Sequence, residues 1–192
     1  NLCAPLQPIR GLERGPAPDV LTMPVGPSGV LLGKVGAGDR LMLPLGDPGD
    51  FTRVHIAADD HLSKRIIIRA AASGERITVH SSDIHRWLSV RPADVALTDR
   101  PRPAPDTTVS VADGALSPSP RPQTLITLGR PGEPPRGHVD ILITQTGPAE
   151  VDVTVRGHTF PVEVELFRAE NRYVAAESIN MMSGSEFADE SR

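Results

Sequence analysis

The sequence is poor in cysteine, in aromatic residues and in long hydrophobic runs. It has one cysteine in 192 residues, Cys3, so no internal disulfide can form and packing alone must hold the fold. Four Phe, one Trp and one Tyr, with an apolar fraction of 39%, indicate a core of modest size. Apolar stretches such as Ile66–Ile68 are three residues long, whereas a membrane span needs about 20. The chain is therefore not expected to cross a bilayer.

The sequence also lacks an initiating Met, a signal segment and a basic charge balance. Because Asn1 stands first and no charged-then-apolar run follows it, we expect membrane or targeting segments upstream. A net charge of −4 gives no support for nucleic-acid binding, which needs a basic face. Residues 61–102 carry a net charge of +4 and residues 138–192 a net charge of −6. Such opposite regions are typical of an assembly component, although ordinary solvated surface charge also explains them.

Proline divides the chain into segments. Nine of the 20 prolines fall within residues 101–135 and four within the first 18, so these stretches are expected to be extended. The predicted parts are a Pro/Gly-rich lead-in (1–20), an α/β core (21–98), a Pro-rich bridging segment (99–123), a β-rich part packed on the same domain (124–178) and a polar tail (179–192), which is expected to be disordered.

Residues 60–73 have the pattern of a helix. Leu62, Ile66 and Ala70 recur at four-residue spacing, acidic residues that can cap the first turn precede them, and Ser73-Gly74 can end the last turn. The apolar arc is wide, so more than one layer is expected to cover this helix. The residues expected on its water-facing side are Lys64, Arg65 and Arg69.

Strands are predicted on both sides of this helix. Alternation at 53–56 and 77–80 makes a strand-helix-strand unit of the length expected for a parallel crossover. A short helix at 83–88 and a strand at 95–98 extend the same sheet in this interpretation. Apolar runs around the Gly-rich segment 33–40 predict a β-hairpin, and the segment has the wrong spacing and position for a phosphate-binding loop.

The remaining strands are predicted from β-branched runs. One lies in the bridging segment at 108–111; the others are 125–128, 139–144, 151–155 and 162–167. In the last two, valines alternate with polar or acidic residues, which predicts an antiparallel meander with one wet, acidic face. The fold class is therefore α/β (mixed α+β): a strand-helix-strand unit in a mixed sheet, followed by an antiparallel β-rich C-terminal part.

No group of residues forms a recognisable catalytic set. Asp59 and Asp60 follow a strand and are candidates for bridging a metal, but helix capping explains them more simply. The spacing of His61, His80 and His85 matches no zinc motif. We therefore expect no catalytic, cofactor-binding or metal-binding residue and no cofactor.

Trp87 is either a core residue or, with its neighbour, an interface anchor. Its indole and the adjacent guanidinium belong to the two side-chain types that dominate binding hot spots, whereas a lone Trp is more often buried in the core. The possible interface residues are Lys64, Arg65, Arg69, Arg86 and Trp87.

Three segments carry a resemblance to a known family. They are Met23-Pro24-Val25-Gly26-Pro27-Ser28-Gly29-Val30-Leu31-Leu32-Gly33, then Leu43-Pro44-Leu45, then the stretch from Ile66 to Val79 that contains Arg69-Ala70-Ala71-Ala72-Ser73-Gly74. This pattern resembles the C-terminal cytosolic region of EccE, a membrane component of the mycobacterial type VII (ESX) secretion system. The resemblance is best over residues 21–98.

The resemblance implies a non-enzymatic structural subunit that contributes to assembly or stability of the inner-membrane machine. It implies membrane helices upstream of this fragment, EccB, EccC and EccD as partners, and a position on the cytoplasmic side of the plasma membrane of a mycobacterium or related actinobacterium. Neither nucleic acid nor a small-molecule substrate is expected. The family's fold is similar to that of glycosyltransferases without their catalytic residues, so the alternative is a nucleotide-sugar or metal-dependent enzyme. A third option is a ligand- or peptide-binding module at a free edge of the C-terminal meander.

Overall fold

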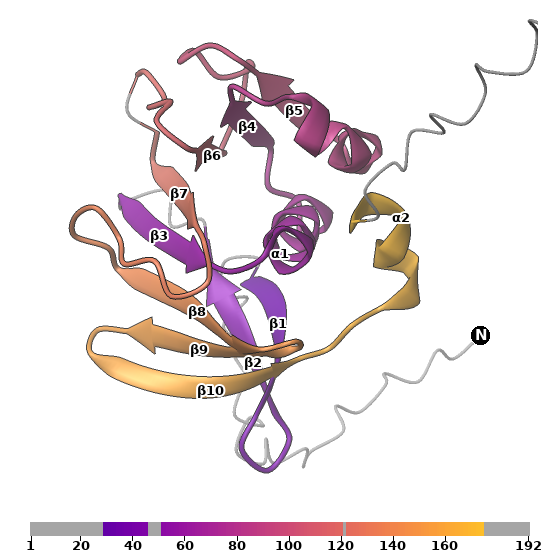
Figure 1. Cartoon of the computed structure of the whole chain (residues 1–192), viewed down its shortest axis with the longest axis vertical. Coiled ribbons are helices and arrows are strands. Elements are labelled where there is room, and N and C mark those ends of the chain that lie inside the picture. Colours follow the sequence, from indigo (N-terminus) through magenta and orange to yellow (C-terminus); the bar gives the residue numbers. More distant parts are fainter. Residues whose placement is uncertain (1–28, 46–50, 121, 175–192) are drawn as a thin grey trace, which may run out of the picture.

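The computed structural model describes residues 29–45, 51–120 and 122–174 (Figure 1). The predicted lead-in at 1–20 and the tail at 179–192 lie outside the described residues. In chain order the strands are β1 (Gly29–Val35), β2 (Asp39–Pro44), β3 (Thr52–Ala57), β4 (Ile77–Ser81), β5 (Val95–Thr98), β6 (Val109–Asp113), β7 (Thr124–Gly129), β8 (Ile141–Gly147), β9 (Glu150–Val155) and β10 (His158–Val164). The helices are α1 (Asp60–Ala72) and α2 (Asn171–Val174), with the 3-10 helices η1 (His85–Ala93) and η2 (Arg168–Glu170).

The strands form one ten-stranded mixed sheet in the order β2-β1-β10-β9-β8-β3-β7-β6-β4-β5. From β8 to β5 all neighbours are parallel, and from β8 to β2 all neighbours are antiparallel. The predicted fold class is therefore confirmed. The meander β8-β9-β10 lies inside the sheet, whose outermost strands are β2 and β5. The pairing of β10 with β1 covers only Val162–Val164 of its outer edge, and a binding module at the edge of the meander stays a prediction.

The strand-helix-strand unit is a parallel crossover, as predicted, and the interior strands β7 and β6 lie between its two strands. The strand β6 comes from the Pro-rich segment 99–123, so that segment supplies a central element of the sheet as well as a bridge. The predicted helix at 83–88 is a 3-10 helix at His85–Ala93. The predicted strand at 162–167 instead spans His158–Val164, because the chain leaves the sheet after Val164.

The two faces of the sheet differ in chemistry. Successive residues of a strand point to opposite faces. On the face covered by α1, η1 and α2, which we call the helical face, the residues are aliphatic, for example Val79 and Val111. Figure 1 shows α1 and α2 on the same side of the sheet. On the opposite face, which we call the loop face, the residues include His55, Thr78 and Ser110, which are also buried.

Helix α1 begins and ends as predicted. Asp59 is the N-cap and accepts the backbone N–H of Leu62 through Oδ1 at 2.8 Å, and Ser73 is the C-cap. The predicted exposure of Lys64, Arg65 and Arg69 is wrong: these residues are 2%, 8% and 8% exposed. The reason is that η1, η2 and α2 pack over the flanks of α1 that do not contact the sheet. No helix among the described residues is long and apolar enough to span a membrane.

Candidate functional site on helix α1

The five predicted interface residues belong to two polar clusters on helix α1 and its neighbours. We call the first the strap cluster: Arg65, Arg69, Glu170 and Asn171. We call the second the Asp60 cluster: Asp60, Lys64, Arg86, Trp87 and Asp113. Each cluster joins α1 to segments that are distant in sequence.

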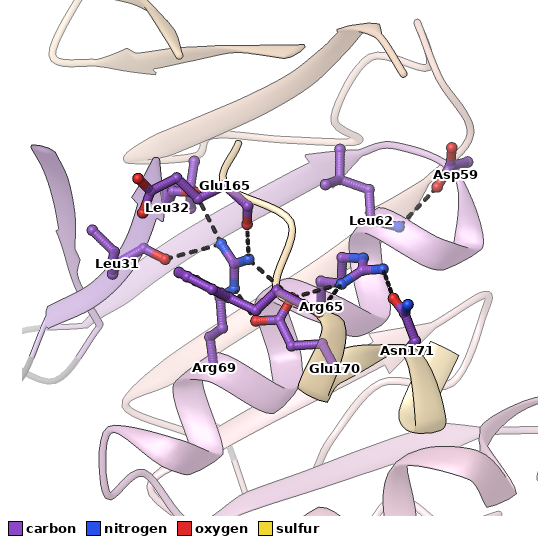
Figure 2. A network of polar contacts seen from close by, with 10 residues as sticks. Leu31, Leu32, Asp59, Leu62, Arg65, Arg69, Glu165, Glu170 and Asn171 are labelled. Carbon is purple, nitrogen blue, oxygen red and sulfur yellow. Dashed lines mark hydrogen bonds and ion pairs between the residues drawn. The ribbon is translucent and has the colours of Figure 1, made fainter. Parts of the chain in front are cut away.

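The strap cluster attaches residues 165–174, which we call the strap, to α1. The strap leaves β10 and returns across the helix, so that the Glu170 carboxylate lies between two guanidinium groups (Figure 2). Arg69 Nε donates to Glu170 Oε1 at 2.6 Å, and an Arg65 amino group donates to Glu170 Oε2 at 2.7 Å. Arg65 also donates to Asn171 Oδ1 at 2.7 Å. Two charge-assisted pairs thus converge on one buried carboxylate.

Arg69 also completes the sheet where β10 ends. The last residue pair between β1 and β10 is Gly33 with Val164. Beyond it the Arg69 guanidinium donates to the carbonyl oxygens of Leu31 at 3.2 Å and Leu32 at 2.9 Å, and to that of Glu165 (Figure 2). Arg69 therefore connects α1, β1 and the strap, and buried backbone acceptors that β10 does not reach are satisfied.

The strap cluster keeps Glu170 ionised at neutral pH. Burial favours the neutral acid, but the hydrogen bonds and charges of Arg69 and Arg65 outweigh it and hold the pKa of Glu170 below its ordinary 4.5. The cluster therefore carries two positive charges and one negative charge in a buried position. Removal of the carboxylate leaves two cations facing each other.

The Asp60 cluster lies at the other end of α1. Asp60 pairs with Lys64 at 2.8 Å and with Arg86 Nε at 2.6 Å, and Arg86 continues to Asp113 at 3.0 Å. The Trp87 indole N–H donates to the second Asp113 oxygen at 2.7 Å. This cluster ties the first turn of α1 to η1 and to the carboxyl end of β6.

Four of the five predicted interface residues are buried within the chain. Trp87 is 0% exposed, which confirms its interpretation as a core residue. Only the Arg86 side chain, 38% exposed, is accessible to a partner in this state. The interface role of the five residues stays a prediction, and for four of them it requires movement of the covering segments.

The candidate metal ligands have structural partners. Asp59 caps α1 and accepts an amide N–H of Gln145 at 2.9 Å, while Asp60 faces two cations. His80 is buried on the loop face, where Nδ1 lies 2.8 Å from the carbonyl oxygen of Arg100. Within residues 29–45, 51–120 and 122–174, no three His, Cys, Asp or Glu side chains form a group suited to a metal ion.

A cavity of about 880 Å³ on the loop face was not predicted. It is lined by β3, β7 and the segment 129–139, and it extends to Asp59 and Asp60 at the carboxyl end of β3, where parallel sheets commonly bind ligands. His55 lines it, with Nε2 at 3.1 Å from the carbonyl oxygen of Glu133 and Nδ1 at 2.9 Å from Thr127 Oγ1. Because a carbonyl oxygen only accepts, Nε2 is the donor in its contact with Glu133.

Comparison with known proteins gives one informative similarity. The chain is 44% identical over 207 aligned residues to the ESX-2 secretion system protein EccE2 of Mycobacterium tuberculosis (strain CDC 1551 / Oshkosh). The alignment covers 96% of this chain and 38% of EccE2, so the chain spans well under half the length of that relative. No protein-family model matches the chain, and no solved structure matches it.

Proposed function

Because the chain is a homologue of the ESX secretion protein EccE2, as its motifs predicted, we propose that it is a non-enzymatic structural part of a type VII secretion machine. It contributes to assembly or stability of the inner-membrane complex from the cytoplasmic side, next to EccB, EccC and EccD. The observation that carries the proposal is 44% identity over nearly the whole chain.

The contacts of the charged residues support a structural role. Arg65 and Arg69 belong to the basic region 61–102 and Glu170 to the acidic region 138–192, and they pair with each other inside the chain. The acids Asp60 and Asp113 likewise pair with cations of α1 and η1. These side chains join elements of the fold, which is what a rigid assembly component requires.

The direct test is deletion of residues 21–170 in the organism's own gene. We expect loss of the assembled membrane complex in native electrophoresis and loss of co-purified EccB, EccC and EccD. A fully assembled complex in the deletion strain contradicts the proposal. Arg86→Glu tests the accessible member of the predicted interface, and Arg91→Glu, also exposed and on η1, is the matched control for the added charge.

The cavity favours one second candidate, a nucleotide-sugar or metal-dependent enzyme. Its 880 Å³ volume and its place at the carboxyl end of β3, next to Asp59 and Asp60, are suited to a ligand. Thermal unfolding with Mn²⁺, Mg²⁺ and nucleotide sugars distinguishes the two functions, because a specific ligand raises the melting temperature by mass action. An unchanged melting temperature at millimolar ligand counts against the enzyme.

A further inference from the structure

The strap places a carboxylate into a receptor that α1 already provides. Two guanidinium groups converge on Glu170 at 2.6 and 2.7 Å, and Asn171 accepts a further hydrogen bond from Arg65. Arginine pairs in this arrangement recognise carboxylates through charge and geometry together. The site is thus specific for an acidic side chain, whichever segment supplies it.

The attachment of the strap combines this polar contact with limited apolar packing: Tyr173 lies partly buried against the core, and the Arg69 guanidinium lies over the Phe167 ring. Within residues 165–174 only Glu170 and Val174 are buried, whereas Leu166 and Phe167 are 52% and 44% exposed. A buried ion pair contributes little net stability, because desolvation opposes the attraction. Segments with little apolar burial open before the sheet does. Among the described segments that pack around α1, the strap is therefore expected to detach first.

Detachment leaves the receptor in place. Arg69 keeps its hydrogen bonds to the carbonyl oxygens of Leu31 and Leu32 on β1 and to that of Glu165, the first residue of the strap, which directly follows β10. Its guanidinium therefore stays oriented when residues 166–174 move away. An oriented cation binds a new carboxylate with less entropic cost than a mobile one.

We propose that Arg65 and Arg69 form an exchangeable carboxylate site, in which an acidic segment of a partner protein replaces the chain's own Glu170. Charge complementarity selects the occupant, since removal of Glu170 leaves two buried cations that only an anionic group neutralises. The strap is then an internal competitor that keeps the site closed until the partner is present. The inference depends on the proposed function only for the source of that partner.

The test uses the full chain and a labelled, amidated peptide of residues 166–174, whose one carboxylate is that of Glu170. We expect the peptide to bind Glu170→Gln at least tenfold more tightly than wild type, because the weakened strap no longer competes. Glu163→Gln, an exposed acid on β10, is the matched control and should bind as wild type does. A second peptide with Gln in place of its Glu should lose binding. Equal affinity of wild type and Glu170→Gln, or of both peptides, overturns the proposal.

Hydrogen exchange of the wild-type chain keeps the proposal testable if Glu170→Gln misfolds. We expect the amides of residues 168–174 to exchange by local opening, well before those of β3. Strap amides that exchange only together with β3 overturn the proposal. If the wild type forms a concentration-dependent dimer and Glu170→Gln abolishes it, the site binds a second copy of this chain. That result overturns the proposal that a different partner protein occupies the site. These measurements need no secretion machine, so their failure is separable from failure of the proposed function.

Discussion

The two faces of the sheet are buried by different means. On the helical face, aliphatic side chains such as Val79 and Ile126 pack against α1 and its neighbours. On the loop face, His80 and Thr78 are 0% exposed, yet they are covered by irregular loop segments and hydrogen-bonded to them. Burial of apolar surface stabilises the first face, while the second relies on satisfied polar groups.

This difference explains how a chain with few aromatic residues and many prolines makes a large sheet. Proline-rich segments cannot form helices that would cover the second face. They cover it as irregular backbone with bends and a turn, whose carbonyl and N–H groups need polar partners: Ala104 N–H donates to Thr78 Oγ1 at 3.2 Å, and His80 contacts the Arg100 carbonyl at 2.8 Å. Polar residues on one face of the strands are therefore matched to the covering segments.

The largest effect on stability is expected at Arg69, a charged side chain that is buried on the helical face. Arg69→Ala removes the hydrogen bonds to β1 and the strap and leaves Glu170 with Arg65 as its remaining cation. We expect the free energy of unfolding to fall by about 3–5 kcal/mol, because Glu170 loses one of its two cations and the carbonyl oxygens of Leu31 and Leu32 lose their donor. Urea denaturation measures it. Arg91→Ala, exposed on η1, is the control and should change it by less than about 0.5 kcal/mol.

Truncation of an aliphatic residue tests the packing of the helical face directly. Ile66 on α1 is 1% exposed, and Ile66→Ala is expected to lower the free energy of unfolding by about 3 kcal/mol through lost burial and a cavity. Ile66→Val, which removes one methylene, should cost about 1 kcal/mol in the same urea experiment. A loss below that of the valine variant would mean that the helical face is loosely packed.

The helical face is the part of the fold that the sequence predicts well. Four-residue spacing from Leu62 to Ala70 fixes the helix, and alternation locates β3, β4 and β9. Alternation also continues through Leu166, which is 52% exposed, so it places the end of β10 too late. Periodicity describes side chains in order along the chain, but it cannot show where a neighbouring strand stops.

The candidate site was only partly predictable for the same reason. The exposure predicted for Lys64, Arg65 and Arg69 is wrong because distant segments cover α1: Trp87 of η1 lies against Lys64, and Glu170, 101 residues after Arg69, pairs with Arg65 and Arg69. No local signal links the two segments; the opposite net charges of their regions were the only indication. The cavity on the loop face depends on segment 129–139, whose Gly and Pro residues predict a loop but not its path.

Adjacent residues of β4 allow a reciprocal test of the two faces. Thr78→Val keeps the side-chain shape and removes a hydroxyl that bonds Thr107 and Ala104 on the loop face. Val79→Thr adds a hydroxyl to the apolar helical face. We expect both to lower the free energy of unfolding by about 1–2 kcal/mol. A neutral Thr78→Val would show that hydrogen bonds do not stabilise the loop face.

The smallest effect is expected at Asp60, whose side chain is partly exposed and whose contribution to stability, unlike that of the apolar core, depends on pH. Burial of Asp60 favours the neutral acid, but hydrogen bonds and charges of Lys64 and Arg86 outweigh it and lower its pKa below 3.8. Its contribution is therefore complete above that pH and is lost as the pH falls through the lower, folded-state value. Asp60→Asn should thus lower the melting temperature slightly at pH 7, by an amount equivalent to at most about 1 kcal/mol. The difference from wild type should shrink with acidification, whereas the difference between Ile66→Ala and wild type should not. A constant difference down to pH 3 would show that Asp60 acts by shape and not by charge.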